Sequence, residues 1–381
     1  MWLALHLPQL PLEASAHLPS PSAIIERGRV LCADNAARQA GIARGTGAAA
    51  ARMLVPAIAL IDRDRQREIA ALHRLACWAG SLTPRISLTP DTLLLEIGGC
   101  LRLFGGLEKL VAAAQDGIQA QGFSARIAAA PTPLGAEWLA RSATAALCRD
   151  AEALRRQLAA LPIGLLPDQA AATLARFGLR TLADVRRLPS GDLARRIGSE
   201  SLQALARAFG ELPDPRVDFV FPERFALSLQ LPAAVENAGT LLFAARRLTA
   251  ALAGWLAVRQ AGVREITLRL QQRQAESLLL LQFADPTADA GRFERVLRER
   301  LENTSLDAPV EALRLEATHV DALPGRNRPL FTDVNADHEA IGVLFERLCA
   351  RLGEQQIYRL RVHDDHRPEC VRPRQIQSAS P

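Results

Sequence analysis

The order of predicted elements between residues 225 and 320 restricts the fold more than any other feature of this chain. Two segments, 225–231 and 313–318, alternate apolar and polar residues, as strands with one buried face do, and two further segments between them also read as strands. Two segments between them repeat apolar residues every three or four positions, as amphipathic helices do. The strands are expected at 225–231, 263–270, 278–283 and 313–318, and the helices at 236–260 and 292–303. This β-α-β-β-α-β order is that of a ferredoxin-like split βαβ unit.

The first 160 residues mix strands and helices less regularly. Two of the strands are expected to form a hairpin around Pro90 and Asp91. Strands are predicted at 2–7, 23–25, 86–88, 92–97 and 124–130, and helices at 34–56 (interrupted at Gly41 and Gly45), 64–80, 105–121 and 134–148. This mixture predicts an α+β domain built around a small sheet.

Residues 161–215 contain no strand candidate and read as short helices separated by prolines and glycines. From residue 323 the chain reads as a linker that carries prolines and arginines. A short helix is expected at 337–352, followed by a polar tail from residue 363.

Composition excludes some classes of protein and leaves others open. Hydrophobic residues make up 49% and charged residues 23% of the 381, which is typical of a folded globular chain rather than a disordered one. No apolar run approaches the roughly 18 residues of a membrane span, and no secretory signal is recognisable, so we expect a cytoplasmic protein without membrane contact. The six cysteines are far apart, which predicts reduced thiols and neither a zinc site nor a disulfide framework. The net charge of +5 permits nucleic-acid binding without requiring it.

Several motifs occur in an order that resembles a known family. Residues 30–38 read VLCADNAAR and continue to Gly41, Gly45 and Pro56, and residues 92–97 read TLLLEI before LFG at 103–105. These resemble the fingers and the second palm motif of Y-family translesion DNA polymerases. LHLPQLPLE at 5–13 and DHRPE at 365–369 are typical of the ImuB-like group, the polymerase-like proteins of bacterial mutagenesis cassettes.

The resemblance implies a polymerase right hand with an additional domain. The palm, with a small mixed sheet, is expected at 1–25 and 77–160, and the helical fingers at 26–76. A thumb with helix-hairpin-helix turns is expected at 161–215, and the βαββαβ unit at 220–322 corresponds to the little finger. Residues 323–381 remain as a linker with a short C-terminal helix and tail.

The metal-binding positions of this family are altered here. Nucleotidyl transfer needs two divalent ions held by several carboxylates. The family's first-strand aspartate falls at about His6, and its Asp-Glu pair falls at Asp91 and Thr92, so one carboxylate remains. The family's two lysines after the third palm strand fall at Pro133 and Glu137, and the second replacement reverses the charge. The resemblance therefore implies no catalytic residue, no metal and no cofactor, although Asp91 can be either a turn residue or a remnant metal ligand.

Other residues are candidates for binding phosphate or DNA. Arg38 matches the arginine that contacts the triphosphate, but a helix-surface arginine would look the same. RRIGS at 195–199 keeps Arg195, Arg196 and Gly198 at the second thumb hairpin, where backbone N–H groups can bind a phosphate. Arg264 and Arg269 lie on a strand of the little finger, where they could contact DNA or form a solvated face.

The linker contains a candidate clamp-binding peptide. Bacterial clamp-binding peptides resemble Gln-x-x-Leu-Phe, and Asn327, Leu330 and Phe331 fit this pattern with a shorter amide. Alternatively, Leu330 and Phe331 cover the little finger.

The resemblance implies an adaptor in error-prone translesion synthesis during the SOS response to DNA damage. Such a protein binds primer–template DNA without sequence preference and binds the sliding clamp. It recruits an error-prone C-family DNA polymerase and a RecA-like partner. Two alternatives stay open: an active polymerase whose metal site is rebuilt from Asp91, Glu96 and Glu13, and an interaction protein that keeps only the fold.

Overall fold

Strand β1 (Trp2–His6) forms the centre of the first sheet. The sheet has the order β5-β6-β1-β7, and β1 is antiparallel to both neighbours. Leu3, Ala4 and Leu5 are fully buried because helices and loops cover both faces of this strand. The other strands are β5 (Ile86–Thr89), β6 (Thr92–Glu96) and β7 (Arg126–Ala130), so the predicted strands and hairpin are confirmed. The register pairs His6 with Thr92 and with Arg126.

The computed structural model describes residues 1–15, 18–144, 146–306 and 308–323, with Leu344, Leu348, Arg351 and two short strands beyond them. These strands are β13 (Tyr358–Leu360) and β14 (Arg374–Ile376), which pair with each other. The chain divides into a first unit, Met1–Val220, and a second unit, Phe221–Pro381. Candidate residues Asn327, Leu330 and Phe331, and most of the helix expected at 337–352, lie outside the described residues.

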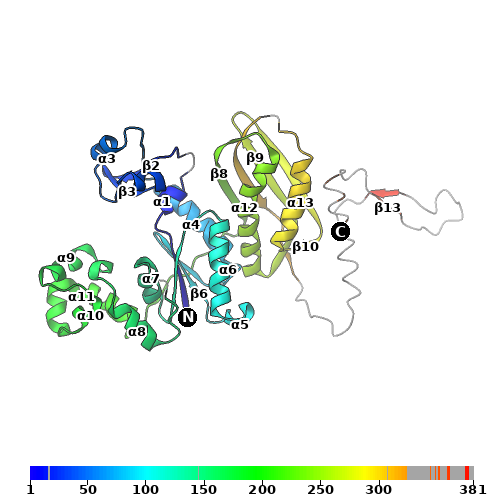
Figure 1. Ribbon diagram of the computed structural model, residues 1–381. Coiled ribbons are helices and arrows are strands. Elements are labelled where there is room, and N and C mark those ends of the chain that lie inside the picture. The colour runs from blue at the N-terminus through cyan, green and yellow to red at the C-terminus, as the bar shows by residue number, and fades with distance from the viewer. Residues whose placement is uncertain are drawn as a thin grey trace. The chain divides into compact units, whose positions relative to one another are not determined.

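Three helices pack against the first sheet (Figure 1). They are α4 (Arg65–Ala79), α6 (Leu107–Ala120) and α7 (Pro133–Arg141), and the four-residue helix α5 (Leu101–Phe104) precedes α6. The Asp64 carboxylate caps α4, as its position before the periodic residues predicts. The helix predicted at 134–148 ends early, at Arg141. Ala143 takes a φ of 60°, and the chain then pairs with β7 through Cys148 N and Ala129 O, 2.8 Å apart.

A second, three-stranded sheet follows β1 in the chain. Its order is β3-β2-β4, with β2 (Ser22–Glu26), β3 (Arg29–Ala33) and β4 (Ala59–Asp62). Short helices flank it: α1 (Leu10–Glu13), α2 (Asn35–Gln39) and α3 (Ala48–Leu54). Its small core includes Ala23, Val30, Ala37 and Ile42. Only β2 was predicted, since β3 (RVLCA) and β4 (ALID) show no alternation of apolar and polar residues.

Residues 151–208 are helical (Figure 1), so most of the helical region predicted at 161–215 is confirmed and the helices begin earlier than expected. The elements are α8 (Ala151–Ala159), the 3-10 turn η1 (Ile163–Leu165), α9 (Asp168–Arg176), α10 (Leu182–Arg186) and α11 (Ser190–Ala208). Gly198, with φ 79° and ψ 156°, breaks α11 into two parts. The core of this helical region is continuous with β1 and α7 through Ala4, Ala136 and Leu154.

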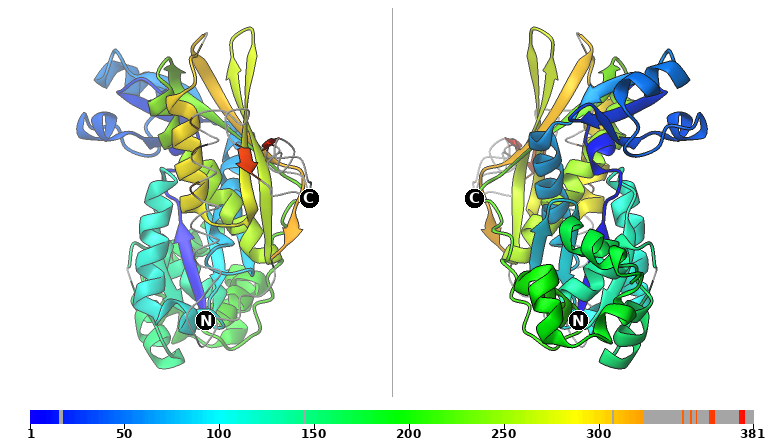
Figure 2. Two further views of the ribbon diagram at one scale, coloured as in Figure 1. Left: turned by 90° about the vertical axis from the view of Figure 1, so that its right-hand side faces the viewer. Right: turned by 90° about the vertical axis from the view of Figure 1, so that its left-hand side faces the viewer.

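The second unit has the predicted β-α-β-β-α-β order. Its elements are β8 (Phe225–Val235), α12 (Ala238–Arg259), β9 (Ala261–Gln272), β10 (Glu276–Thr287), α13 (Ala290–Glu302) and β11 (Val310–Ala317), with the short β12 (Asp321–Ala322) paired to β9. The sheet order β10-β9-β11-β8 puts β11 between the strands joined by α12. It also puts β9 between the strands joined by α13, so both crossovers are split βαβ units. Both helices lie on one face of the sheet (Figure 2).

Helix α12 is the one helix among the described residues that is long and apolar enough to cross a membrane by length and composition. No uninterrupted apolar run in the sequence had marked this helix as a possible membrane span. Leu241, Leu248, Leu252 and Trp255 are fully buried in the second unit. The apolar character of α12 is thus that of a core helix.

Candidate functional site

The end of β1 and the β5–β6 turn bring His6, Asp91 and Thr92 together. His6 Nδ1 lies 3.2 Å from Thr92 Oγ1 and 3.6 Å from Asp91 Oδ1. Thr92 Oγ1 donates to the same Asp91 oxygen at 3.0 Å. The backbone N–H of Leu7 donates to Asp91 O at 2.8 Å, which holds the turn against the end of β1. The three residues that the resemblance aligned with metal-binding positions therefore form one partly buried polar cluster.

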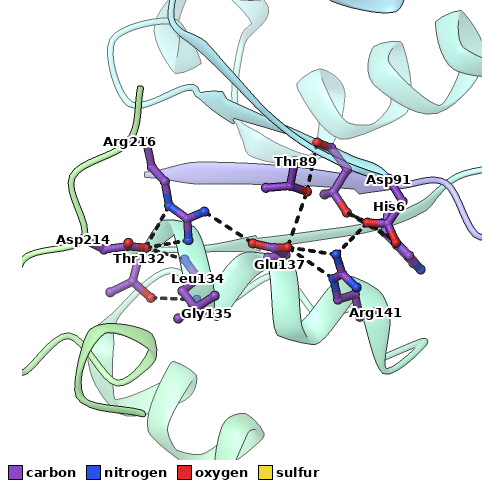
Figure 3. Close-up of polar contacts among 11 residues, drawn as sticks. His6, Thr89, Asp91, Thr132, Leu134, Gly135, Glu137, Arg141, Asp214 and Arg216 are labelled. Carbon is purple, nitrogen blue, oxygen red and sulfur yellow. Dashed lines mark hydrogen bonds and ion pairs between the residues drawn. The ribbon is translucent and has the colours of Figure 1, made fainter. Parts of the chain in front are cut away.

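Arg141, at the end of α7, completes this cluster (Figure 3). Its Nη2 lies 2.6 Å from Asp91 Oδ1 and 3.2 Å from Glu137 Oε1. Sequence reasoning did not select Arg141. The available signal was the spacing of Glu137 and Arg141, because residues four apart on a helix face each other.

Glu137 continues a chain of alternating charges away from Asp91 (Figure 3). Its side chain is 7% exposed, and Oε2 lies 3.5 Å from Arg216 Nη1. Arg216 Nη2 pairs with Asp214 at 2.8 Å, and Asp214 accepts from Leu134 N at 3.0 Å. Glu137 was expected to put a negative charge near a bound triphosphate. The structure instead buries it between Arg141 and Arg216, and it is not among the residues that line the neighbouring cleft.

The surroundings of Asp91 favour its ionised form. Burial of the carboxyl group acts to raise its pKa. The hydrogen bond to His6, the charges of Arg141 and His6, and the hydrogen bond from Thr92 together outweigh this burial and lower the pKa below its ordinary value. Asp91 is therefore a carboxylate whose charge is already balanced within the chain.

A cleft of about 730 Å³ in the first unit opens onto His6, Asp91 and Arg141. Residues 7–11, parts of the second sheet and its helices, and the start of the helical region form the rest of its wall. Five arginines and two acidic residues line it, which gives a net charge of +3 with His6 neutral. The charged lining residues are Arg38, Arg44, Arg63, Arg126, Arg141, Glu68 and Asp91.

The arginines of the cleft differ in how they are paired. Arg63 forms a salt bridge with Glu68 at 2.6 Å and another with Glu26 at 3.3 Å, so both Arg63 and Glu68 are neutralised. Arg38 donates to Asn35 Oδ1 at 2.5 Å, and Arg126 donates to the carbonyl of Arg141 at 3.2 Å. Within the described part of the chain, Arg38, Arg44 and Arg126 have no carboxylate partner.

The donor set at Asp91 does not fit two divalent metal ions. A magnesium pair requires several oxygen ligands, and the cluster offers one carboxylate that already contacts a guanidinium. Among the residues described, no three or more His, Cys, Asp or Glu side chains are grouped to hold a metal ion.

The other two carboxylates of the active-polymerase alternative lie elsewhere. Glu13 accepts from Ser124 Oγ at 2.6 Å and from Ser124 N at 3.0 Å, and its burial raises its pKa. Glu96 lies 3.4 Å from the amino group of Met1, at the opposite end of β6 from Thr92. Neither residue lines the cleft that contains Asp91.

The thumb candidates lie at the break in α11. Arg195, Arg196 and Gly198 are exposed, and the guanidinium of Arg196 lies over the Phe177 ring at 4.4 Å from its centroid. Gly198 has a backbone conformation that is nearly restricted to glycine, as a hairpin turn requires. These three residues are not part of the cleft lining.

The two candidates on β9 are engaged by neighbouring residues of the second unit. Arg269 pairs with Glu316 at 2.8 Å and with Glu276 at 2.9 Å. Arg264 pairs with Asp321 at 3.3 Å and donates to Ala284 O at 2.8 Å. Their charges are thus balanced by acidic residues on the strands β10, β11 and β12.

Comparisons with known proteins agree with the motif resemblance. Residues 15–141 match the impB/mucB/samB family. The chain is 27% identical over 339 residues to Protein ImuB from Caulobacter vibrioides (strain NA1000 / CB15N), which covers 86% of this chain and 73% of that protein. Protein ImuB of a second strain of this species gives the same values.

Solved structures of Y-family polymerases are also similar to this chain. A Dbh ternary complex has a TM-score of 0.47 and 15% identity, over 84% of this chain and 98% of that chain. DinB from Sulfolobus solfataricus has a TM-score of 0.43 and 14% identity, over 85% and 99%. The resemblance to the Y-family and to ImuB-like proteins, inferred from the motifs, is confirmed by the sequence matches.

Proposed function

We propose that this chain, which carries an impB/mucB/samB family domain and is similar to Protein ImuB over most of its length, works in DNA synthesis without catalysing nucleotidyl transfer. The salt bridge between Arg141 and Asp91 carries this proposal. It places a fixed positive charge on the one carboxylate that remains of the expected metal site. His6 and Thr92 supply no further carboxylate, and Glu13 and Glu96 are bound elsewhere.

The chain then acts as an adaptor in error-prone translesion synthesis. It binds primer–template DNA and the sliding clamp, and it recruits an error-prone C-family polymerase and a RecA-like partner. The similarity to Protein ImuB and the order of the family motifs support this role. Several weak contacts on one chain raise the local concentration of the recruited polymerase at a stalled primer end, and this is the contribution of an adaptor.

Its DNA contacts are proposed at the break in α11. Arg195 and Arg196 are exposed and have no carboxylate partner among the described residues, so both are available to phosphate groups. Arg269 is a weaker candidate because a phosphate would have to displace two carboxylates. Binding of this kind depends on phosphate charge and is independent of sequence.

The first experiment is primer extension on a gapped template with all four deoxynucleotides and magnesium or manganese, with and without the clamp. We expect no extension above a blank without protein, because the cluster cannot hold two ions. An Asp91→Ala variant runs beside the wild type. Extension by the wild type that disappears in Asp91→Ala would show that the chain is an enzyme, which is the active-polymerase alternative.

Binding to DNA is tested by fluorescence anisotropy of a labelled primer–template over a range of salt concentrations. Changing both Arg195 and Arg196 to alanine is expected to weaken binding and to reduce the slope of log K against log[salt] by about 2, because each phosphate contact contributes about 0.9. The matched control changes Arg155 and Arg156, an adjacent exposed pair on α8. Equal effects in both variants, or affinity without salt dependence, would favour an interaction protein that keeps only the fold.

Clamp binding is tested by surface plasmon resonance with immobilised clamp. Changing Asn327, Leu330 and Phe331 to alanine is expected to abolish binding if this peptide is the contact. Phe243→Ala is the matched control, because Phe243 belongs to another Leu-Phe pair and is 71% exposed on α12. Clamp binding that survives the triple change would place the contact elsewhere.

A further inference from the structure

We propose that Arg141 takes the place of a divalent cation in the cleft of the first unit, so that the cleft binds the phosphate groups of a polyanion directly through arginines and without a metal ion. The proposal rests on the non-catalytic part of the proposed function. Its test measures binding rather than primer extension, so the two can fail separately.

The position of Arg141 is the first observation. Its guanidinium contacts Asp91 Oδ1, the same oxygen that His6 and Thr92 contact. Glu137 holds the same guanidinium from the other side at 3.2 Å, and Glu137 is itself fixed by Arg216. A divalent ion at Asp91 would have to displace this guanidinium or lie beside its charge, which is unfavourable in a partly buried site.

The unpaired arginines are the second observation. Arg38, Arg44 and Arg126 line the same cleft and have no carboxylate partner among the described residues. The acidic residues of the cleft cannot neutralise them, because Glu68 is taken by Arg63 and Asp91 by Arg141. Guanidinium groups bind phosphate oxygens through paired, charge-assisted hydrogen bonds. A net charge of +3 spread over the cleft wall therefore suits several phosphate groups.

A third observation concerns Gln9, which also lines the cleft. Its Oε1 is buried and has no hydrogen-bond partner among the residues that the structure describes. Buried polar atoms are rarely left without a partner. Because this oxygen has almost no accessible surface, a donor from a ligand could reach it only if the Gln9 side chain turned toward the cleft.

These observations define the ligand by its chemistry. It carries two or more phosphate groups, and it comes either from a free nucleotide or from a nucleic-acid strand. Both sources present the same phosphate oxygens to Arg38, Arg44 and Arg126, so the experiment must separate them.

Isothermal titration calorimetry of the full chain tests the proposal. The probes are inorganic tripolyphosphate, deoxyadenosine triphosphate and a 5′-phosphorylated single-stranded oligonucleotide, each with EDTA and with magnesium. We expect binding in EDTA that magnesium does not strengthen. Tighter binding of the triphosphates would assign the cleft to a free polyphosphate, and tighter binding of the oligonucleotide would assign it to a strand. No binding in EDTA, or binding that requires magnesium, would overturn the proposal.

Arg44→Gln is the most informative variant. Arg44 is exposed and has no side-chain partner among the described residues, so its loss should not affect folding. We expect affinity in EDTA to fall about tenfold, as for loss of one charge-assisted hydrogen bond. The matched control, Arg149→Gln, removes an exposed arginine that pairs with Glu108 outside the cleft. Equal affinity in Arg44→Gln and wild type would contradict direct binding by the cleft arginines.

Electron paramagnetic resonance of Mn²⁺ tests the role of Arg141 independently. The variant His6→Asp with Thr92→Glu restores two carboxylates beside Asp91. We expect it to bind Mn²⁺ weakly, and we expect the further change Arg141→Gln to strengthen binding at least tenfold, because the resident cation is then absent. Equal Mn²⁺ affinity with and without Arg141 would show that Arg141 does not exclude the metal.

Discussion

Asp91 shows how one contact can change the role of a carboxylate. In sequence it could be a turn residue or a remnant metal ligand. In the structure it is both part of the β5–β6 turn and the partner of Arg141, with Oδ1 and Nη2 2.6 Å apart. Its negative charge holds α7 against the hairpin, which is a structural role.

The lowered pKa of Asp91 predicts a pH dependence of stability. A carboxyl group whose folded-state pKa is depressed contributes stability above its unfolded pKa of about 3.9, and this stability is lost as the pH falls through the folded value. Asp91→Asn should therefore lower the free energy of unfolding by about 1 kcal/mol at pH 7, after allowing for partial exposure. The difference from wild type should shrink below about pH 4.

Urea denaturation at pH 7, 5 and 3.5 measures this effect. Asp116→Asn serves as the control, since Asp116 is exposed on α6. A constant difference between Asp91→Asn and wild type at all three pH values would refute the linkage.

Glu137 should be one of the most sensitive polar positions of the first unit. Glu137→Gln keeps the shape of the side chain but removes the charge shared by Arg141 and Arg216. We expect a loss of about 2–4 kcal/mol in the free energy of unfolding, because breaking a buried ion pair leaves its partners uncompensated. Glu152→Gln, which removes an i,i+4 pair with Arg156 at an 80% exposed side chain, should cost about 0.5 kcal/mol or less. Similar losses at both positions in chemical denaturation would argue against the buried network.

At the scale of single elements, α11 depends on one glycine. Gly198 has φ 79° and ψ 156°, and a Cβ placed there would meet nothing within 4 Å. Any cost of a side chain at this position is therefore backbone strain and not a clash.

Gly198→Ala should destabilise the first unit by about 1–3 kcal/mol. Gly191→Ala is the matched control in the same helix: an added methyl group would also meet open space there, and the φ of Gly191 is not positive. We expect Gly191→Ala to be neutral or to stabilise by about 0.5 kcal/mol. Thermal unfolding of both variants checks this, and equal midpoints would mean that the α11 break tolerates a side chain.

Elements with a clear periodic pattern or a turn signal were the easiest to predict from the sequence. Helix α4 and the order of the second unit follow from periodicity and from capping by Asp64. Strands β3 (RVLCA) and β4 (ALID) show no alternation of apolar and polar residues, whereas the equally short β5 (ISLT) alternates and the Pro90-Asp91 turn marks its hairpin with β6. The early end of α7 depends on pairing with β7 in space, which no local signal shows.

The site was predictable only in part, because contacts between residues far apart in the sequence leave no local signal. The motif order located His6, Asp91 and Thr92, and the structure brings them within hydrogen-bond or ion-pair distance. The partner of Asp91 lies 50 residues away in sequence, so Arg141 could not be selected from local context. Arg269 looked available for DNA because Glu316 and Glu276 reach it only through the sheet register.

At the scale of the whole molecule, each unit has a core of its own. Phe293 is fully buried in the second unit and packs edge-on against Phe283, with centroids 5.2 Å apart. Leu3 and Leu5 are fully buried in the first unit. Units with separate cores can unfold in separate cooperative steps.

Phe293→Ala should lower the stability of the second unit by about 3–5 kcal/mol, because it removes a fully buried aromatic ring. Differential scanning calorimetry should then show one transition moved to lower temperature and the other unchanged. Glu137→Gln should lower the temperature of the other transition, in which the first unit unfolds. The two variants are therefore controls for each other. A single transition that shifts as a whole in both variants would contradict independent unfolding.

The place of β11 in the second sheet has a consequence for synthesis of the chain. β11 is the last long strand of this unit to be made, yet it lies between β8 and β9. During synthesis on the ribosome, the edges of β8 and β9 that pair with β11 stay unpaired until Val310–Ala317 has emerged. The sheet of the second unit can close only after β11 has left the exit tunnel, and until then a chaperone would find open strand edges in this part of the nascent chain.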